Sequence, residues 1–398
     1  MAARASLQDV DTHDVSQPSA AGAAPARNRF DLPEWAGAFG DLGTLIPFVV
    51  AYIAVLGLDP AAVLLPFGIA LVVVGARYRT PMPVQPMKAA GAIAVTEAGL
   101  VGAAAVQAAT LATGAIWLAL AFTGLAQRLA RAIPRPVVVG IVLGLGFALM
   151  IQGLEMMRGD WLVAGVAFAA ALLLLASRKV PAMLVLLVLG AVAAIVRDPS
   201  LARDLAAISF DPRLPELGFA NLSWRDAWIG IVLVALPQVP LTFGNAMVAI
   251  TEENNRLFPD RRVNERTIAA STGMMNLLAA PLGGVPMCHG AGGMAGHVRF
   301  GARTGGATVI LGVLLAVVAL CFASSAQTLL KIVPAAVLGV ILFLAGAQIA
   351  LGSCDFSKDK GERFATLVTA AFAIWNVGAA FVVGLALHAA LKRRLVRL

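Results

Sequence analysis

Charged residues are scarce in this sequence. Lys, Arg, Asp and Glu make up 13% of its 398 residues, whereas soluble domains contain about 25%. Hydrophobic residues make up 60%, and the mean hydropathy is +0.86. Too few polar residues remain to cover one large soluble core. The composition excludes an ordinary soluble protein. It predicts a polytopic membrane protein, because apolar runs follow one another almost without pause.

Cysteines and catalytic motifs are also few. Cys288, Cys321 and Cys354 are odd in number and have no CxxC or metal-binding spacing. The sequence has no nucleotide-binding loop and no interpretable Ser–His–Asp arrangement, and His289 and His297 are eight residues apart. We therefore expect no enzyme, no cofactor and no metal. The net charge of +8 does not indicate nucleic acid, because in a membrane protein the placement of basic residues matters more than their sum.

The first 30 or so residues differ from the rest of the chain. They are rich in Ala and Ser, polar and without periodicity. They contain no apolar stretch, so they do not form a cleaved signal peptide. We expect residues 1–30 to be a disordered cytoplasmic tail.

Apolar segments fill the remainder, and several are shorter than the roughly 20 residues of a straight span. Short spans are stable only when they pack inside the protein. The fourteen predicted spans are 41–57, 61–76, 84–96, 104–126, 134–153, 161–176, 180–196, 226–250, 265–281, 286–297, 305–323, 333–350, 363–375 and 377–391. The last two could also be one helix over 364–391, but "WNVG" at 375–378 favours a hairpin.

Basic residues test this count. If the N-terminus lies inside and the spans alternate, 23 Lys and Arg fall in inside segments, 6 fall outside, and Lys88 lies within a span. Cytoplasmic segments carry an excess of Lys and Arg. The distribution therefore predicts a multi-pass cell-membrane protein with both termini in the cytoplasm.

The chain divides near residue 210 into halves of seven spans each. Because seven is odd, the second half starts on the opposite side of the membrane, and the halves form an inverted repeat. We predict a first repeat over 31–205, an extracytoplasmic link over 206–224 and a second repeat over 225–398. The predicted fold class is an all-α polytopic membrane protein.

The third span of each half is abnormal. "MPVQPMKAAGAIAV" (82–95) and "VPMCHGAGGMAGHV" (285–298) are short and rich in proline and small residues. Pro86 and Pro286 can each open a half-helix near the bilayer midplane. The free N–H groups and partial positive charge of two such ends favour an anion. Interrupted spans at matching positions of inverted halves point to a transporter's binding site.

Several polar residues accompany these segments. Lys88 adds a positive charge, and a buried lysine in a span is a functional candidate, although it could instead pair with Asp41 or Glu97. The neutral polar residues can donate hydrogen bonds to an oxyanion or join helices. His289 could contact the anion, carry a proton or be a satisfied core residue. The candidate substrate-binding residues are Asp41, Thr44, Gln85, Met87, Lys88, Gln238, Thr242, Asn245, Cys288, His289, Gly290 and Gly292.

At these residues the sequence resembles the molybdate transporter 1 family, a branch related to sulfate permeases. The resemblance covers about residues 30–395. It implies a seven-plus-seven inverted repeat fold with a core domain of spans 1–4 and 8–11 and a gate domain of spans 5–7 and 12–14. It also implies molybdate bound between spans 3 and 10. The blocks that carry it are "GAFGDLGTLIPF", "PMPVQPMKA", "LPQVPLTFGNA" and "VPMCHGAGGMAGHVRFGARTGG".

The leading hypothesis is thus a secondary transporter importing molybdate, with tungstate and sulfate left open as substrates and a homodimer left open as the assembly. Sulfate permeases usually carry a C-terminal regulatory domain, and we expect none after Leu398. Nucleobase–proton symporters share the fold and, by resemblance, use carboxylates in spans 8 and 10. Here those spans offer Gln238 and His289 and no Asp or Glu in their central stretches, which favours an anion.

Overall fold

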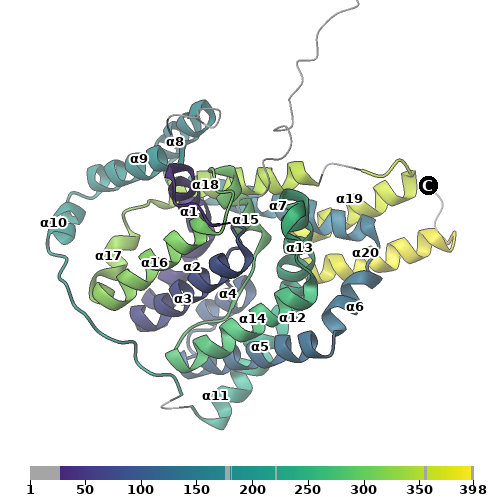
Figure 1. The fold of residues 1–398 in the computed structure, drawn as a ribbon, viewed down its shortest axis with the longest axis horizontal. Helices are drawn as coiled ribbons and strands as arrows, with labels where there is room; N and C mark the ends of the chain where they lie inside the picture. The colour runs from purple at the N-terminus through teal and green to yellow at the C-terminus, as the bar shows by residue number, and fades with distance from the viewer. Residues whose placement is uncertain (1–26, 175–179, 181, 220–221, 354–355, 396–398) are drawn as a thin grey trace, which may run out of the picture.

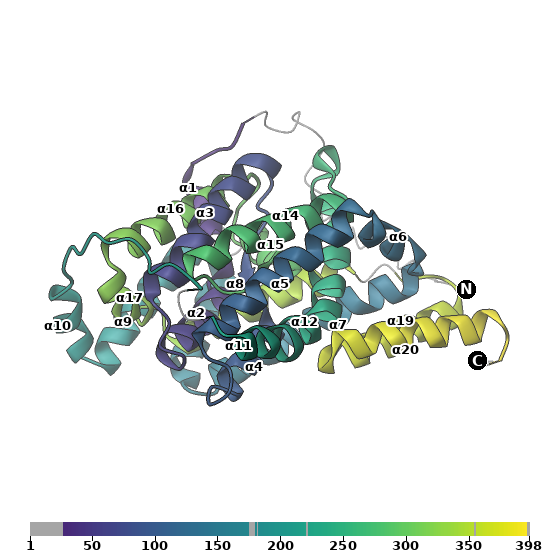
Figure 2. The ribbon, with the colours of Figure 1, turned by 90° about the horizontal axis from the view of Figure 1, so that it is seen from below.

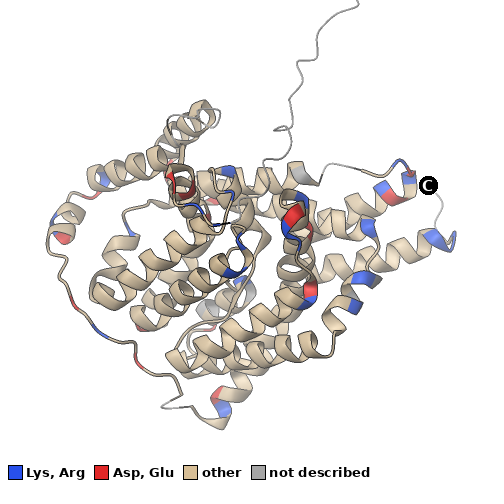
Figure 3. Cartoon of the chain, in the orientation of Figure 1, with Lys and Arg blue, Asp and Glu red and all other residues tan. Residues whose placement is uncertain are grey.

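Apolar helices make up most of the chain, and the computed structural model describes residues 27–174, 180, 182–219, 222–353 and 356–395 (Figure 1). Within these residues, five helices are long and apolar enough to cross a membrane, or up to seven if each of two bent helix pairs counts as one span. Three more apolar helices are shorter. Charged residues lie mostly at helix ends and connections (Figure 3). The chain is therefore a helical polytopic membrane protein, as predicted.

The first half contains ten α-helices, one short 3-10 helix and one strand among its described residues. They are α1 (Leu32–Ala38), η1 (Phe39–Asp41), α2 (Leu42–Ala54), α3 (Pro60–Tyr78), β1 (Gln85–Pro86), α4 (Lys88–Thr96), α5 (Ala103–Phe122), α6 (Leu125–Ala132), α7 (Arg135–Met157), α8 (Trp161–Leu174), α9 (Ala182–Arg197) and α10 (Ser200–Ala206), where η1 is a short 3-10 turn.

The second half repeats this alternation of long helices with one short strand. Its elements are α11 (Trp224–Ile229), η2 (Gly230–Ala235), α12 (Leu236–Phe243), η3 (Gly244–Ala249), α13 (Ile250–Leu257), η4 (Pro259–Arg261), α14 (Glu265–Ala279), η5 (Ala280–Leu282), β2 (Met287–Cys288), α15 (Ala291–Arg299), α16 (Gly306–Cys321), η6 (Ala323–Ser325), α17 (Ala326–Leu330), α18 (Ala335–Gly352), α19 (Lys360–Trp375) and α20 (Val377–Lys392).

Helices from the two halves pack closely in pairs: α3 with α16, α5 with α14, and α7 with α18 and α19. Glycines allow this approach. A Cβ on Gly68 of α3 would lie 2.8 Å from backbone atoms of α16, and a Cβ on Gly146 of α7 would lie 2.8 Å from backbone atoms of α18. Such small residues let membrane helices approach closely. Figure 2 shows α19 and α20 side by side at one edge of the molecule.

One helix is unusually long. Residues 224–257 run as a single helical stretch of 34 residues, in which the π-helical segments η2 and η3 flank α12. Pro237 and Pro240 lie within this stretch. Proline removes a helical N–H donor and displaces the preceding turn, and π segments often mark functional sites in helices. The middle of this helix is therefore irregular where Gln238 and Asn245 project from it.

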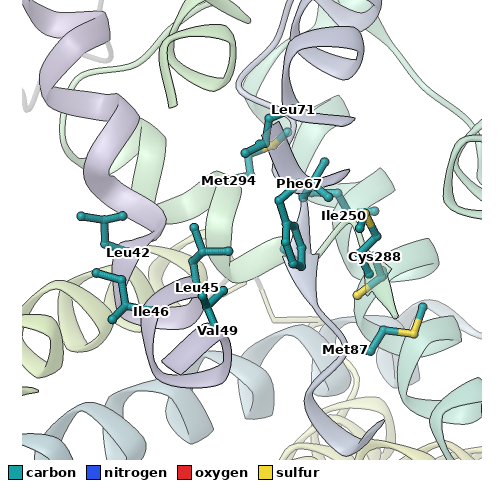
Figure 4. Packing of buried hydrophobic residues seen from close by; sticks show 14 of the residues in the cluster. Leu42, Leu45, Ile46, Val49, Phe67, Leu71, Met87, Ile250, Cys288 and Met294 are labelled. Carbon is teal, nitrogen blue, oxygen red and sulfur yellow. The ribbon is translucent and has the colours of Figure 1, made fainter. Parts of the chain in front are cut away.

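The buried apolar core surrounds the two strands. Leu45 and Val49 of α2 and Phe67 and Leu71 of α3 lie in one cluster with Met294 of α15 (Figure 4). Met87 and Cys288, which directly follow or belong to the strands, are part of the same cluster and at most 3% exposed. The two strands are thus held in place by packing against the buried apolar core.

The helix boundaries agree with most predicted segments. The first helix starts earlier than expected, because α1 and η1 continue into α2 from Leu32. The predicted hairpin is present: α19 ends at Trp375, α20 begins at Val377, and the Asn376 side chain accepts from Ala379 N at 2.9 Å. The short helices α6, α10 and α17 were not predicted.

The predicted disordered tail needs one correction. Residues 1–26 lie outside the described part of the chain, but residues 27–30 are described. The Asn28 side chain donates to Gly75 O at 3.0 Å, and Arg29 N donates to Thr304 Oγ1 at 3.1 Å. These bonds attach the chain to α3 and to the segment just before α16, so Asn28 and Arg29 do not belong to a disordered tail.

Candidate functional site

Two short strands bring together the beginnings of α4 and α15. β1 and β2 pair antiparallel, with Gln85 opposite Cys288 and Pro86 opposite Met287. Met87 N also donates to Pro286 O at 2.9 Å. Prolines favour an extended conformation in the residue before them, which suits these strands. Because the strands are antiparallel, the two nine-residue helices that follow them leave in opposite directions.

A side chain from α14 holds the second strand in place. The Asn276 amide donates to Met287 O at 2.7 Å, and its oxygen accepts from Met287 N at 3.0 Å. Both backbone groups of Met287 are thereby satisfied on the side away from Pro86. Asn276 was not among the predicted site residues. Its one signal is an amide within the otherwise apolar run 273–282.

Two amides of the long 224–257 helix bind the first turns of α4 and α15. Gln238 Oε1 accepts from Ala90 N at 3.0 Å, and Asn245 Oδ1 accepts from Ala291 N at 3.3 Å. Met87 and Gly290, the residues that precede the two helices, provide no side-chain cap. The first N–H groups of a helix have no partner within it. One helix of the second half therefore serves as the cap for both short helices.

A second polar cluster joins the start of α2 to β1. The Gln85 amide donates to Asp41 Oδ1 and, at 2.5 Å, to Thr44 Oγ1, while Thr44 Oγ1 also donates to Asp41 Oδ1. The other Asp41 oxygen is buried and has no hydrogen-bond partner among the described residues. It lies toward α15, since a Cβ on Gly293 would be 2.6 Å from it. The three residues predicted from these two blocks thus meet in one buried network.

Gly290 lies against the same network. A Cβ on this residue would be 1.7 Å from Gln85 Oε1, which is far inside a permissible contact. Only glycine allows β1 and the start of α15 to approach this closely. Gly292 differs, because the space beside it is filled by Leu149 of α7, whose Cδ1 would lie 2.8 Å from an added Cβ.

Lys88 faces a large cavity. It occupies the first position of α4, is half-buried, and lines a cavity of about 1000 Å³ between α2, α4 and α12 on one side and α7, α19 and α20 on the other. Of the twelve predicted residues it is the one that lines this cavity. Other lining residues include Phe48, Ala92, Leu149, Gln152, Pro237 and Trp375. The cavity was not predicted, because its walls come from seven helices, namely α2, α4, α5, α7, α12, α19 and α20.

Both ring nitrogens of His289 are engaged within the protein. Nδ1 lies 2.8 Å from Pro83 O, and Nε2 lies 2.8 Å from Ser271 Oγ. Contact with an anion would require one of these bonds to open. Thr242 is similarly occupied, because its hydroxyl accepts from Gln238 Nε2 at 2.9 Å and lies 3.8 Å from the Met87 sulfur.

Known proteins with similar sequences indicate the family to which this chain belongs. The sequence model of a family described as "Molybdate transporter of MFS superfamily" matches residues 33–149 and 230–349. Molybdate transporter 2 of Arabidopsis thaliana is 34% identical over 412 residues, covering 91% of this chain and 87% of that protein. Molybdate transporter 1 of the same plant is 32% identical over 414 residues, covering 92% and 89%.

Solved structures show the same fold. The transmembrane domain of a cyanobacterium bicarbonate transporter, BicA, has a TM-score of 0.57 at 17% identity and covers 88% of this chain and 97% of that one. Murine Solute Carrier 26 family member A9, in the inward-facing state, has a TM-score of 0.59 at 13% identity and covers 94% and 70%. With relatives above 30% identity along nearly its whole length and a family match over more than half of it, the chain belongs to the molybdate transporter family, and it is a membrane transporter and not an enzyme.

Proposed function

We propose that this transporter imports molybdate across the cell membrane and that the anion binds between the first turns of α4 and α15. The observation that carries the proposal is the β1–β2 pair, which brings the two helix beginnings together inside the protein. The names of the two plant relatives support molybdate as the substrate. Each helix N-terminus carries a partial positive charge of roughly half an elementary charge. Two such ends and Lys88 together match the charge of a dianion.

The large cavity supplies the route. It lies between a core group that contains α2, α4 and α12 and a gate group that contains α7, α19 and α20. Lys88 lies at the boundary between the two groups. Movement of the gate group past the core group would expose Lys88 to one side of the membrane and then to the other. This is alternating access around a fixed site near the midplane, and we propose that it proceeds without ATP, as in a secondary transporter.

The proposed topology has fourteen spans in two inverted repeats, with α4 and α15 as half-helices. Helix packing supports it. When the fourteen spans are numbered along the chain, α3 and α16 are spans 2 and 11, and α5 and α14 are spans 4 and 9. Spans seven apart correspond in the two repeats, so exchanging the repeats converts the packed pair α3–α16 into the packed pair α14–α5. The pair of α7 and α18, spans 5 and 12, maps onto itself. The excess of basic residues on one side supports cytoplasmic termini.

Uptake of labelled molybdate into proteoliposomes tests the function. We expect uptake without ATP, near-equal competition by tungstate, weaker competition by sulfate and none by uracil. Tungstate has nearly the geometry of molybdate, whereas sulfate is smaller, so a fixed set of donors would form longer hydrogen bonds to it. Uracil is neutral and gains little from helix dipoles. Strong competition by uracil with none by tungstate would overturn the anion site, and stronger competition by sulfate than by tungstate would make sulfate the substrate.

A further inference from the structure

An apolar groove runs along the outside of the α3–α14 pair. It encloses about 670 Å³, and its walls are almost entirely apolar residues of these two helices. Val73 and Leu278 on its walls are 59% and 60% exposed. The lipid-facing surface between α3 and α14 is concave over several helical turns, from Pro66 to Tyr78 on α3 and from Thr267 to Ala279 on α14. The groove is therefore shaped to hold one apolar chain along the helices.

A basic pocket lies at one end of this groove. It encloses about 500 Å³ and is lined by four arginines from the end of α3 and from η4, namely Arg77, Arg79, Arg261 and Arg262. The Arg261 guanidinium donates to Arg79 O, which joins the two segments. Burial lowers the pKa of Arg261, and the positive charge of Arg79 lowers it further, while Asp260 partly offsets both effects. An anion in this pocket would relieve the repulsion between the arginines.

The groove and the pocket lie next to each other. Arg77 and Tyr78 line both cavities. The Tyr78 hydroxyl donates to Thr267 O at 3.3 Å, so it bridges α3 and α14 at the junction. The Arg77 guanidinium lies 6.0 Å from the Tyr78 ring centroid. The apolar groove thus lies beside a cluster of arginines. This arrangement matches a lipid, in which an apolar acyl chain adjoins an anionic headgroup.

We propose that this combined groove and pocket binds one anionic glycerophospholipid, with an acyl chain between α3 and α14 and the phosphate at the arginines. Guanidinium groups suit phosphate because they donate in pairs from a planar fork. Basic pockets between membrane helices on the cytoplasmic side are typical sites for anionic headgroups, and these arginines are among the residues predicted to lie on that side. A zwitterionic lipid would bring its own cation to the arginines, and a free phosphate would leave the groove unfilled.

The lipid site adjoins the substrate site. Ser271 lines the groove, and its hydroxyl is 2.8 Å from His289 Nε2. The Tyr78 ring meets the His289 ring edge-on, with centroids 6.2 Å apart. His289 in turn contacts Pro83 O just before β1. A lipid in the groove would therefore press on the side chains that position both strands.

The test is lipid binding to the purified full chain in detergent, measured by native mass spectrometry and thermal shift. The probes are phosphatidylglycerol, phosphatidylcholine and glycerol phosphate. We expect phosphatidylglycerol to bind and stabilise, and the other two to do so far less. The variant Arg77→Gln/Arg262→Gln should bind phosphatidylglycerol roughly thirtyfold more weakly, because each arginine near a headgroup contributes about a factor of five. Arg261 is left intact because it holds Arg79.

Two further variants keep the result interpretable. Arg128→Gln/Arg131→Gln removes two exposed arginines from α6 and should leave phosphatidylglycerol binding unchanged. Val73→Trp fills the groove with an apolar side chain and should weaken phosphatidylglycerol binding without reducing the stability of the lipid-free protein. Equal binding of both lipids, equal loss in the α6 variant, or an unaffected Val73→Trp protein would each overturn the proposal. An equal response to glycerol phosphate would show a headgroup-only anion site and would also overturn it.

Discussion

Among single residues, Lys88 combines a basic side chain with a position at the edge of the largest of the cavities described above. It is half-buried and shares this cavity with apolar side chains from α7 and α20. A lysine in a membrane span is retained where it contacts substrate, solvent or an opposite charge. Its place at the first position of α4 adds its charge to the positive end of that helix.

Replacement of Lys88 tests this role. We expect Lys88→Ala to fold and to bind molybdate about ten- to a hundredfold more weakly, because a charge-assisted contact contributes roughly 1.5–3 kcal/mol. Lys88→Arg keeps the charge but changes its shape and should transport partially. Equilibrium binding of labelled molybdate to the purified variants measures both effects. Unchanged affinity in a folded Lys88→Ala protein would remove Lys88 from the site.

The glycines at the start of α15 provide a matched pair of substitutions. Gly290→Ala would place a Cβ 1.7 Å from Gln85 Oε1, whereas Gly292→Ala would meet only the terminal methyl of Leu149 at 2.8 Å. The first must displace the Gln85 side chain, which donates to Asp41 and Thr44, and overpacking of this kind typically destabilises by about 1–3 kcal/mol. We expect Gly290→Ala to abolish uptake and Gly292→Ala to retain most of it. Uptake and melting temperature of both variants, compared at equal expression, check the difference; equal loss in both would contradict it.

The candidate residues show which parts of a site can be predicted from sequence. Proline and small residues at matching places in the two halves predicted a meeting of two helix beginnings, and the structure brings these segments together. The roles of Gln238 and Asn245 were not predictable. They were expected either to donate to an oxyanion or to join helices, and in the structure their oxygens accept from the backbone N–H groups of Ala90 and Ala291 in two other helices. Whether the oxygen or the NH2 group of an amide side chain makes the contact depends on how distant segments are aligned in the fold. Spacing along the sequence does not determine this alignment.

At the scale of helices and strands, the capping of α4 and α15 from one long helix is the unusual feature. A neutral amide oxygen satisfies an N–H group without cancelling the positive end of the helix. A carboxylate at the same place would stabilise the helix start by about 0.3–1 kcal/mol. It would also repel an anionic substrate. The neutral amides therefore suit a site that must keep its positive potential for the ligand.

Isosteric charge substitutions test this element. Gln238→Glu and Asn245→Asp should keep the fold but weaken molybdate binding at least about tenfold at pH 8, because like charges brought together cost several kcal/mol. Gln107→Glu is the control, since Gln107 Oε1 also accepts from a backbone N–H, that of Phe219 at 2.9 Å, away from the site. Titration calorimetry with molybdate measures the affinities. Full affinity in Gln238→Glu and Asn245→Asp would mean that the anion binds elsewhere.

Helices were easier to predict than the strands. Long apolar runs bounded by basic or proline-rich turns fix α3, α7 and α16 to within a few residues. The strands are two residues each, which is too short to show an alternating pattern. Each strand forms by pairing with the strand of the other half, which is distant in the sequence. The short helix α6 carries its apolar and basic residues on opposite faces and so has no continuous apolar run.

At the scale of the whole molecule, the distribution of basic residues makes a prediction about sidedness. In a background with Cys288, Cys321 and Cys354 replaced, we expect Asp260→Cys and Lys360→Cys to resist a membrane-impermeant maleimide in intact cells. Asp204→Cys should react. All three residues are exposed in the structure, so burial does not explain protection. Each should react once the cells are permeabilised. Labelling at residue 360 but not at residue 204 would refute the fourteen-span topology.

The pairing of β1 with β2 also implies a delay during synthesis, because the two strands leave the ribosome at different times. Gln85 and Cys288 are 203 positions apart, and α4, although it belongs to the first half, takes its cap from Gln238 in the second. Synthesis proceeds at roughly 5–20 residues per second, so roughly 10–40 seconds pass between the emergence of the two strands. During that interval the first half lies in the membrane without the strand that pairs with β1 and without the amide that caps the first turn of α4. Fragments divided between α10 and α11 should therefore assemble only when produced together, and the first fragment alone should be degraded.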